Sequence, residues 1–261
     1  MRILVAIVVT LLFASAVSAS RDGGPGVPEL SRKSRSIGYP FDGRLEHGVL
    51  LRETPFVRYT PEYARDGRFY GTWELVQLLH RAAHRVATRV PGARLSVGEL
   101  SKQGGGRVPG HHSHQNGRDV DIAFYMTDAA GRPFEPWAFA EFDRNGQGRG
   151  PNTMLRFDDA RNWELVQRLV TDGDARIQYI FVSNALKERL LREGERRKTS
   201  PSIMNRVRRT LMQPPTGHPH GNHFHVRIYC SPANRPRCQD RPPYHAWYPG
   251  KPPVGAVVAT R

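Results

Sequence analysis

Two things are scarce in this chain of 261 residues: cysteine, with only two, and long apolar runs, with none after the first twenty residues. A membrane span takes about 20 consecutive apolar residues, so we expect no later segment to cross a bilayer. Cys230 and Cys238 lack the CxxC spacing and the additional cysteines that are typical of thiolate zinc sites. The length is sufficient for a sizeable core in one or two domains.

Acidic residues are also few relative to basic ones. The chain has 24 Asp and Glu against 39 Lys and Arg, a formal net charge of +15 and a pI near 10.5. Such a charge attracts polyanions. The basic residues are scattered, and no nucleic-acid-binding motif or basic stripe with interleaved aromatics is present, so we expect no nucleic-acid partner. A cell wall or membrane surface is the polyanion that fits an exported protein, and charge that serves solubility alone is the alternative.

The N-terminus resembles a secretory signal. Residues 1–19 combine Arg2, an apolar stretch over 3–13 and small residues at 17–19. An uncleaved N-terminal anchor is the alternative. We therefore expect a periplasmic or otherwise exported protein without stable membrane insertion once the signal is removed. Export favours a disulfide between Cys230 and Cys238. Nothing in the sequence sets the oligomeric state.

Composition and periodicity predict four segments and an α+β fold. A flexible leader over 20–35 follows the signal, residues 36–240 form the main domain, and 241–261 form a Pro-rich tail without core signal. Helices are predicted over 72–90, 158–171, 184–193 and 204–212, the third capped by Asn184, with a charged linker over 194–202. Strands are predicted over 93–98, 122–125, 177–182 and 223–229. We expect a small, mostly antiparallel sheet flanked by helices, with a metal site on the sheet.

Two histidine-rich stretches carry the chemistry, and each runs into a predicted strand. The first holds His111, His112 and His114 and ends in Asp121; the second holds His218, His220, His223 and His225. Residues i and i+2 on a strand share a face, so His223 and His225 point the same way. A catalytic zinc ion takes about three nitrogen or oxygen ligands and keeps one open position. Surface imidazoles are the alternative, and we do not assign His112 or His218 to the site.

A further histidine pair lies on the first predicted helix. His80 and His84 are four residues apart and share a helix face, but the glutamate that follows the first histidine in HExxH proteases is missing. The surrounding arginines favour a solvated basic face. Arg107, in the glycine-rich loop before His111, is a candidate for a substrate carboxylate, with a solvated surface arginine as the alternative.

The two histidine stretches resemble a known family. SHQNGRDVDI (113–122) and HGNHFHVR (220–227) are similar to the penicillin-insensitive murein endopeptidases, a branch of the zinc peptidases grouped with lysostaphin, D-Ala-D-Ala metallopeptidases and Hedgehog-type domains. SIGYPFDGRL (36–45) and the approach over 95–112 support the resemblance, which spans roughly residues 36–240.

The resemblance implies a role for each matching residue. His114, Asp121 and His225 match the three ligands of one catalytic Zn²⁺, His223 matches the general base, and His220 matches a further active-site histidine. His111 matches a position that can hold a second metal. The other ligands of that second site have no visible counterpart, because Asp143 lacks a histidine three residues on.

The resemblance also implies an activity, hydrolysis of the D-alanyl cross-link to diaminopimelate in peptidoglycan by a water that zinc activates. His223 would take the proton from this water and deliver it to the leaving amine. A D,D-carboxypeptidase on the same scaffold, which would need a cationic pocket for a free carboxylate, remains an alternative. So does a non-enzymatic zinc protein that binds the wall.

Overall fold

The computed structural model describes residues 33–253, 255 and 258–259. The expected signal, residues 1–19, and most of the expected leader lie outside these residues. Within the described part of the chain, no helix is long and apolar enough to cross a membrane.

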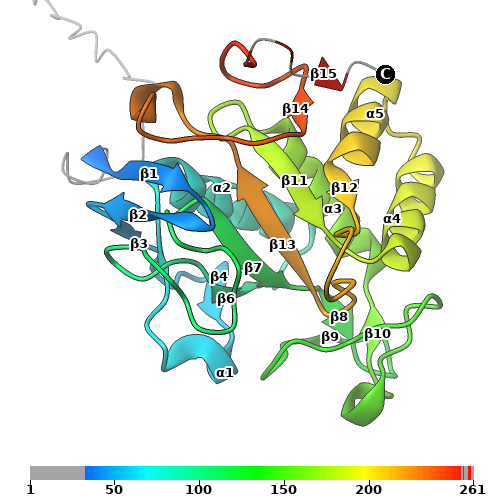
Figure 1. The fold of residues 1–261 in the computed structure, drawn as a ribbon. Helices are drawn as coiled ribbons and strands as arrows, with labels where there is room; N and C mark the ends of the chain where they lie inside the picture. The colour runs from blue at the N-terminus through cyan, green and yellow to red at the C-terminus, as the bar shows by residue number, and fades with distance from the viewer. Residues whose placement is uncertain (1–32, 254, 256–257, 260–261) are drawn as a thin grey trace, which may run out of the picture.

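A six-stranded mixed sheet forms the centre of the molecule (Figure 1). In spatial order its strands are β12 (Leu211–Met212), β11 (Ile177–Phe181), β13 (His223–Ile228), β7 (Asp119–Ala123), β6 (Leu95–Glu99) and β4 (Val57–Tyr59). The three central pairings are antiparallel, and the two outer pairings, β11 with β12 and β4 with β6, are parallel. The α+β class with a mostly antiparallel sheet is thus confirmed.

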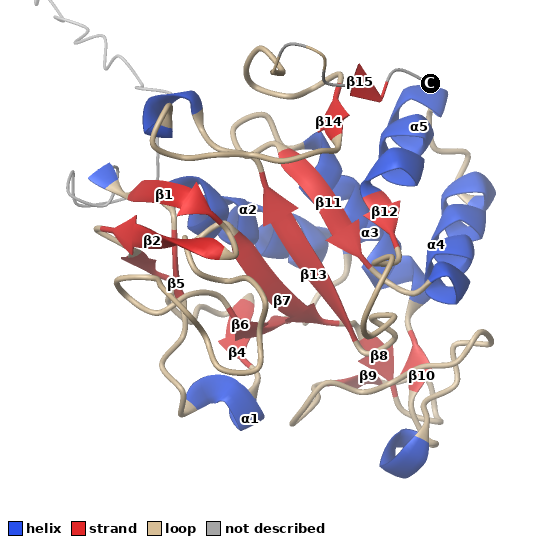
Figure 2. Cartoon of the chain, viewed as in Figure 1, coloured by secondary structure: helices blue, strands red, loops and turns tan. Residues whose placement is uncertain are grey.

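Helices cover one face and one edge of this sheet (Figure 2). They are α1 (Pro61–Ala64), α2 (Trp73–Arg89), α3 (Asp159–Thr171), α4 (Asn184–Arg196) and α5 (Pro201–Thr210), with short 3-10 turns η2 (Gly150–Asn152) and η3 (Pro232–Asn234). In the view of Figure 1, α2 and α3 lie behind the central strands, and α4 and α5 lie beside β12.

Capping side chains decide where these helices begin. Thr72 accepts a hydrogen bond from the backbone N–H of Leu75 and begins α2 as expected. The cap of α4 is Ser183 rather than Asn184, because the Ser183 hydroxyl accepts from Leu186 while Asn184 already has helical geometry. Proline is favoured in the first helical turn, and α5 accordingly begins at Pro201, three residues before the expected start. The expected linker over 194–202 is correspondingly shorter.

Four small sheets surround the central one. They are a hairpin of β1 (Arg35–Tyr39) and β2 (Asp42–Glu46); a pair of β3 (Val49–Leu50) and β5 (Tyr70–Gly71); a trio of β8 (Met126–Thr127), β9 (Pro133–Phe134) and β10 (Arg156–Phe157); and a pair of β14 (Tyr244–His245) and β15 (Val258–Ala259).

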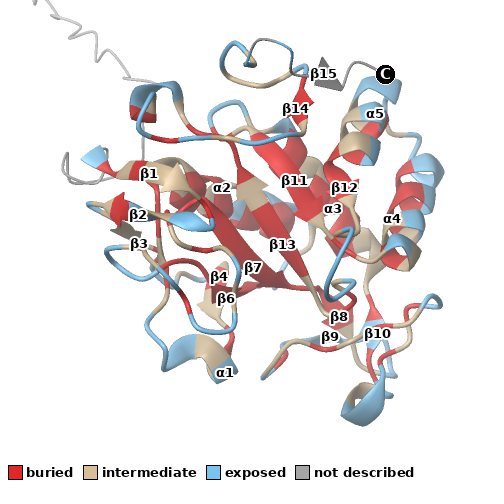
Figure 3. Ribbon diagram, in the orientation of Figure 1, coloured by how far each residue is buried: buried red, intermediate tan, exposed pale blue. Residues whose placement is uncertain are grey.

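Alternation along β7 and β13 separates the core from the polar site. The apolar residues of these strands are fully buried in the core, together with residues of α2 and α3: Val120, Ile122, Phe224 and Val226. The residues between them point to the opposite face: Asp119, Asp121, His223 and His225. Figure 3 shows both strands largely buried, and on the polar face Asp119, Asp121 and His225 are buried as well.

The segment after β13 packs against the sheet more closely than its composition predicted. The expected disulfide between Cys230 and Cys238 is present. Tyr244 and His245 are buried, and the indole of Trp247 donates a hydrogen bond to the carbonyl of Ile177. The first part of the expected Pro-rich tail is therefore part of the folded domain.

Candidate metal centre

The loop that carries His114 is fixed by contacts with the segments around it. His114 has a left-handed backbone, with φ of 66°, and its side chain is completely buried. The Ser101 hydroxyl donates to the His114 carbonyl at 2.6 Å, and the next residue, Gln115, donates from its backbone to the carbonyl of Pro40 in the β1–β2 hairpin. Gly117 follows with φ of 77°, where a Cβ would lie 2.8 Å from the side chain of Leu45. This turn therefore requires glycine, and it aims the imidazole at the sheet.

Hydrogen bonds set the tautomer of His114. Its Nδ1 lies 2.9 Å from the carbonyl of Leu100, which can only accept, so Nδ1 carries the proton. Nε2 is left with its lone pair, and it lies 3.3 Å from Oδ2 of Asp121.

The register between β13 and β7 brings the imidazole of His225 next to Asp121 and His114. His225 on β13 pairs directly with Asp121 on β7, and both side chains rise from the same face. Nδ1 of His225 lies 2.9 Å from Oδ1 of Asp121 and 3.3 Å from Nε2 of His114. Two donors on a tetrahedral zinc ion, at bonds of about 2.05 Å, lie about 3.3 Å apart. The two imidazole nitrogens thus have the spacing that such an ion requires, and each lies close to one oxygen of the Asp121 carboxylate, His114 to Oδ2 and His225 to Oδ1.

His111 lies at the edge of this group. Donor atoms of His111, His114 and Asp121 all lie within 4.8 Å of one another and could hold a metal ion. Nδ1 of His111 is 3.7 Å from Oδ2 of Asp121, while its Nε2 lies 2.5 Å from the buried carboxylate of Glu99. The sequence reasoning did not consider Glu99, which an ion pair with Arg68 also holds.

His223 and His220 stand beside the metal-binding group. Nε2 of His223 is 3.5 Å from Oδ1 of Asp121, and its Nδ1 is 2.7 Å from the side-chain oxygen of Asn222. The ring of His223 stacks on that of Phe139, with their centres 4.6 Å apart. The centre of the His220 ring lies 4.8 Å from that of His223. All six residues selected from the sequence therefore come together. His112 is exposed, and His218 is also exposed and contacts the group only through His220, whose backbone N–H donates to its ring.

The chain is similar to a family of known proteins. The profile of the family described as penicillin-insensitive murein endopeptidase matches residues 43–248, most of the chain. The chain belongs to this family. A penicillin-insensitive murein endopeptidase of Salmonella heidelberg is 29% identical over 184 residues, and one of Salmonella newport is 31% identical over 184 residues. Each alignment covers 67% of this chain. The chain spans 59% of the length of each of these relatives.

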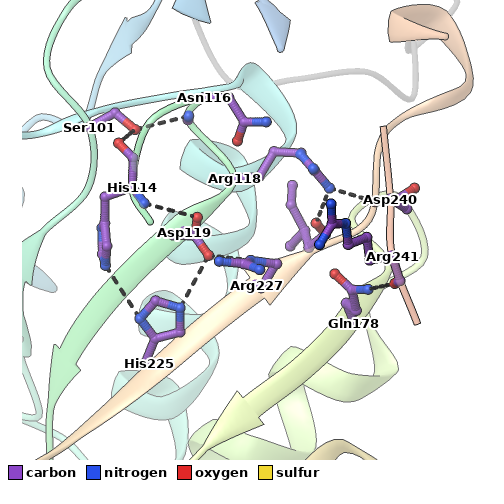
Figure 4. Close-up of polar contacts among 12 residues, drawn as sticks. Ser101, His114, Asn116, Arg118, Asp119, Gln178, His225, Arg227, Asp240 and Arg241 are labelled. Atoms are coloured by element: carbon purple, nitrogen blue, oxygen red, sulfur yellow. Dashed lines mark hydrogen bonds and ion pairs between the residues drawn. The ribbon is translucent and has the colours of Figure 1, made fainter. Parts of the chain in front are cut away.

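In this family member, a buried carboxylate that sequence reasoning missed supports the centre. Oδ1 of Asp119 lies 3.1 Å from Nε2 of His225, and its Oδ2 accepts from the backbone N–H of His114. Figure 4 shows the Asp119 carboxylate between His114, His225 and the guanidinium of Arg227. Its position two residues before Asp121 on one strand was the available signal, because alternate residues share a face.

Burial and charge act against each other on the ionisable groups of the site. Burial would raise the pKa of Asp121, but the imidazoles of His114 and His223 outweigh it and hold that pKa well below its usual value. Burial would lower the pKa of His225, but hydrogen bonds to Asp119 and Asp121 raise it overall. His220 has no such carboxylate partner, so burial, followed by the repulsion of His223 and His225, lowers its pKa to about 4.

A cavity of about 360 Å³ opens beside His225 in this family member. Tyr179 and Phe181 line it, and their rings also stack on His225 at 6.2 and 5.6 Å. Arg241 lies on the far wall, carried by the segment after the disulfide. Arg107, the candidate considered from the sequence, is instead exposed on the glycine-rich loop.

Proposed function

We propose that this chain is a zinc-dependent D,D-endopeptidase that hydrolyses the D-alanyl–diaminopimelate cross-link of peptidoglycan. The observation that carries the proposal is that Nε2 of His114 and Nδ1 of His225 lie 3.3 Å apart, each close to one oxygen of the Asp121 carboxylate. Membership of a family described by murein endopeptidase activity supports the substrate class.

His114, Asp121 and His225 would hold the zinc ion. We choose His225 over His111 as the third ligand because its Nδ1 lies nearer to Asp121, at 2.9 Å against 3.7 Å. The Asp119 carboxylate fixes the His225 ring with Nδ1 facing the other two donors. His111, with its Nε2 held by Glu99, would form the rim of the site.

The proposed chemistry combines a zinc ion with general acid–base catalysis by His223. Bound zinc would bring the pKa of a coordinated water to about 7 and polarise the scissile carbonyl. His223 would accept the proton of the attacking water at Nε2 and later donate it to the leaving amine. Asn222 holds Nδ1 of His223, and Phe139 holds the ring face, so this imidazole has a fixed orientation.

The surroundings fit an exported enzyme. We propose that residues 1–19 are a cleaved secretory signal and that the remaining chain acts in the periplasm or outside the cell. The disulfide between Cys230 and Cys238 fits an oxidising compartment, and the net charge of +15 fits an anionic wall polymer.

A D,D-carboxypeptidase is the second candidate, because the cavity beside His225 contains arginine side chains that could face a terminal carboxylate. The test is to incubate the purified exported chain with cross-linked muropeptide dimers and with pentapeptide monomers, with and without zinc, and to identify products by mass spectrometry. Zinc-dependent release of monomers from dimers supports the endopeptidase. Loss of terminal D-Ala alone would favour the carboxypeptidase, and no product from zinc-loaded protein would favour a wall-binding module.

A further inference from the structure

The cavity beside His225 is cationic, and one of its cations is unpaired. Three arginines line it, and no acidic residue does. Arg118 is buried and pairs with Asp240 at 2.6 Å. Arg227 pairs with Asp119 at 2.5 Å. Arg241, in contrast, makes no ion pair with any residue of the described chain, and its side chain is exposed to the cavity mouth.

Aromatic rings position the Arg241 guanidinium without occupying its N–H donors. The guanidinium carbon lies 4.7 Å from the ring centre of Tyr39 and 4.5 Å from that of Phe41, and these two rings stack on each other at 5.1 Å. Stacking uses the face of the guanidinium and leaves its edge free. The backbone is held as well, because the side chain of Gln178 donates to the Arg241 carbonyl, as Figure 4 shows.

This arrangement is suited to a carboxylate. A guanidinium edge presents parallel N–H groups that match the two oxygens of a carboxylate. The rest of the lining, including Tyr179, Phe181 and Pro243, suits an aliphatic or peptide chain. Since Tyr179 and Phe181 also contact the His225 ring, a substrate group in the cavity would lie next to the proposed metal centre.

We propose that this cavity is a substrate subsite in which Arg241 binds a free carboxylate of a peptidoglycan stem peptide. The inference rests on the proposed function for its substrate class. Two carboxylates share the required chemistry: that of diaminopimelate at the cross-link, and that of a terminal D-Ala. Arg241 is thus a specificity-determining residue and takes no part in the bond-breaking step.

Steady-state kinetics on purified muropeptides test the proposal. The wild-type chain, Arg241→Gln and Arg241→Lys are compared on dimers whose diaminopimelate carboxylate is free or amidated, and on pentapeptides. We expect Arg241→Gln to raise KM about tenfold on the free carboxylate with kcat little changed, and to have no effect on the amidated form. Arg241→Lys should recover part of the loss. A loss confined to pentapeptides would assign the subsite to the terminal D-Ala carboxylate.

A matched control separates charge from location. Arg192 is exposed on α4 and does not line the cavity, and Arg192→Gln removes the same net charge. This variant should behave as wild type. Equal KM values for wild type and Arg241→Gln would overturn the proposal, and so would an equal rise in KM on free and amidated dimers. A rise in KM for Arg192→Gln as large as that for Arg241→Gln would also overturn it.

A binding measurement separates this inference from the proposed function. Calorimetric titration of chelator-treated protein with the uncleaved dimer requires no catalysis. Weaker binding by Arg241→Gln, with unchanged thermal midpoint, supports the subsite even if no cleavage is ever seen. Identical binding by both proteins, in a preparation that does cleave dimers, would sink the subsite and leave the endopeptidase proposal standing.

Discussion

Nε2 of His225 lies 3.1 Å from Oδ1 of Asp119, on the opposite side of the ring from the nitrogen that faces Asp121. One imidazole therefore bridges two carboxylates that stand two residues apart on the neighbouring strand. The hydrogen bond to Asp119 holds the ring proton on Nε2, so Nδ1 is the atom whose lone pair a metal ion can bind.

This relationship predicts that Asp119 matters for metal binding without touching the metal. Asp119→Asn keeps the shape but removes the charge that supports His225, and we expect zinc affinity to fall about 10- to 100-fold. Competition with a chromogenic chelator measures it. Asp240→Asn is the control, because Asp240 is equally buried against an arginine but contacts no imidazole. Similar losses in both variants would show that general destabilisation, and not ring orientation, is responsible.

The choice of the third ligand predicts opposite results for two histidines. His225→Ala should abolish stoichiometric zinc binding, because only two of the three proposed ligands, His114 and Asp121, would remain. His111→Ala should keep about one zinc per chain, since His111 is engaged by Glu99. Metal analysis after dialysis decides between them. Retention of zinc by His225→Ala together with loss in His111→Ala would assign the ligands to the alternative group of His111, His114 and Asp121.

Separate roles for ligands and base predict a variant that binds metal but does not turn over substrate. His223→Ala should keep about one zinc per chain while kcat falls by a factor on the order of 10² to 10⁴, the usual contribution of a general base. Product release from muropeptide dimers and metal content are measured on the same preparation. His80→Ala, a half-buried histidine on α2, is the control and should leave kcat unchanged. Zinc loss in His223→Ala would mean that His223 is a ligand.

An ion pair between α2 and α3 predicts a pH-dependent part of the stability. Asp172 contacts Arg81 at 2.8 and 2.9 Å. Burial alone would raise the pKa of Asp172, but the hydrogen bond and charge of Arg81, together with backbone hydrogen bonds from Ala175 and Asp174, outweigh it and lower the pKa below its usual value. A carboxylate with a lowered pKa in the folded state stabilises the fold above about pH 4 and loses this contribution as the pH falls further.

Asp172→Asn removes that contribution. The variant should therefore be less stable than wild type at pH 7, by about 1 kcal/mol or less because the pair is partly exposed, and the difference should shrink at pH 3. Denaturant unfolding at both pH values measures it, with Arg81→Gln as the matched partner change. A difference that grows towards pH 3 would contradict the assignment of the charge state.

Much of the secondary structure followed from local signals. Apolar spacing and the Thr72 cap located α2, and the apolar runs at β11 and β13 located two central strands within a residue or two. The errors lie where two local signals compete. At α4 a serine and an asparagine were both possible caps, and only the hydrogen bond of Ser183 to Leu186 decides between them. The packing of Tyr244 and His245 was missed because a Pro- and Arg-rich segment carries no periodicity, although tertiary contacts bury it.

The sequence by itself determined which residues are the candidates for the chemistry. The two histidine-rich motifs and their family resemblance select His114, Asp121, His223 and His225 before any coordinates are known. Strand alternation places His223 and His225 on one face, because side-chain direction on a strand follows from position alone. Only the tertiary structure decided which nitrogen each imidazole offers, that Asp119 holds the His225 ring while Glu99 holds that of His111, and that Arg241 lines a cavity without a counter-charge. Those properties depend on atoms far apart in the chain, and the register of β7 against β13 and the closure of the tail over β11 bring them together.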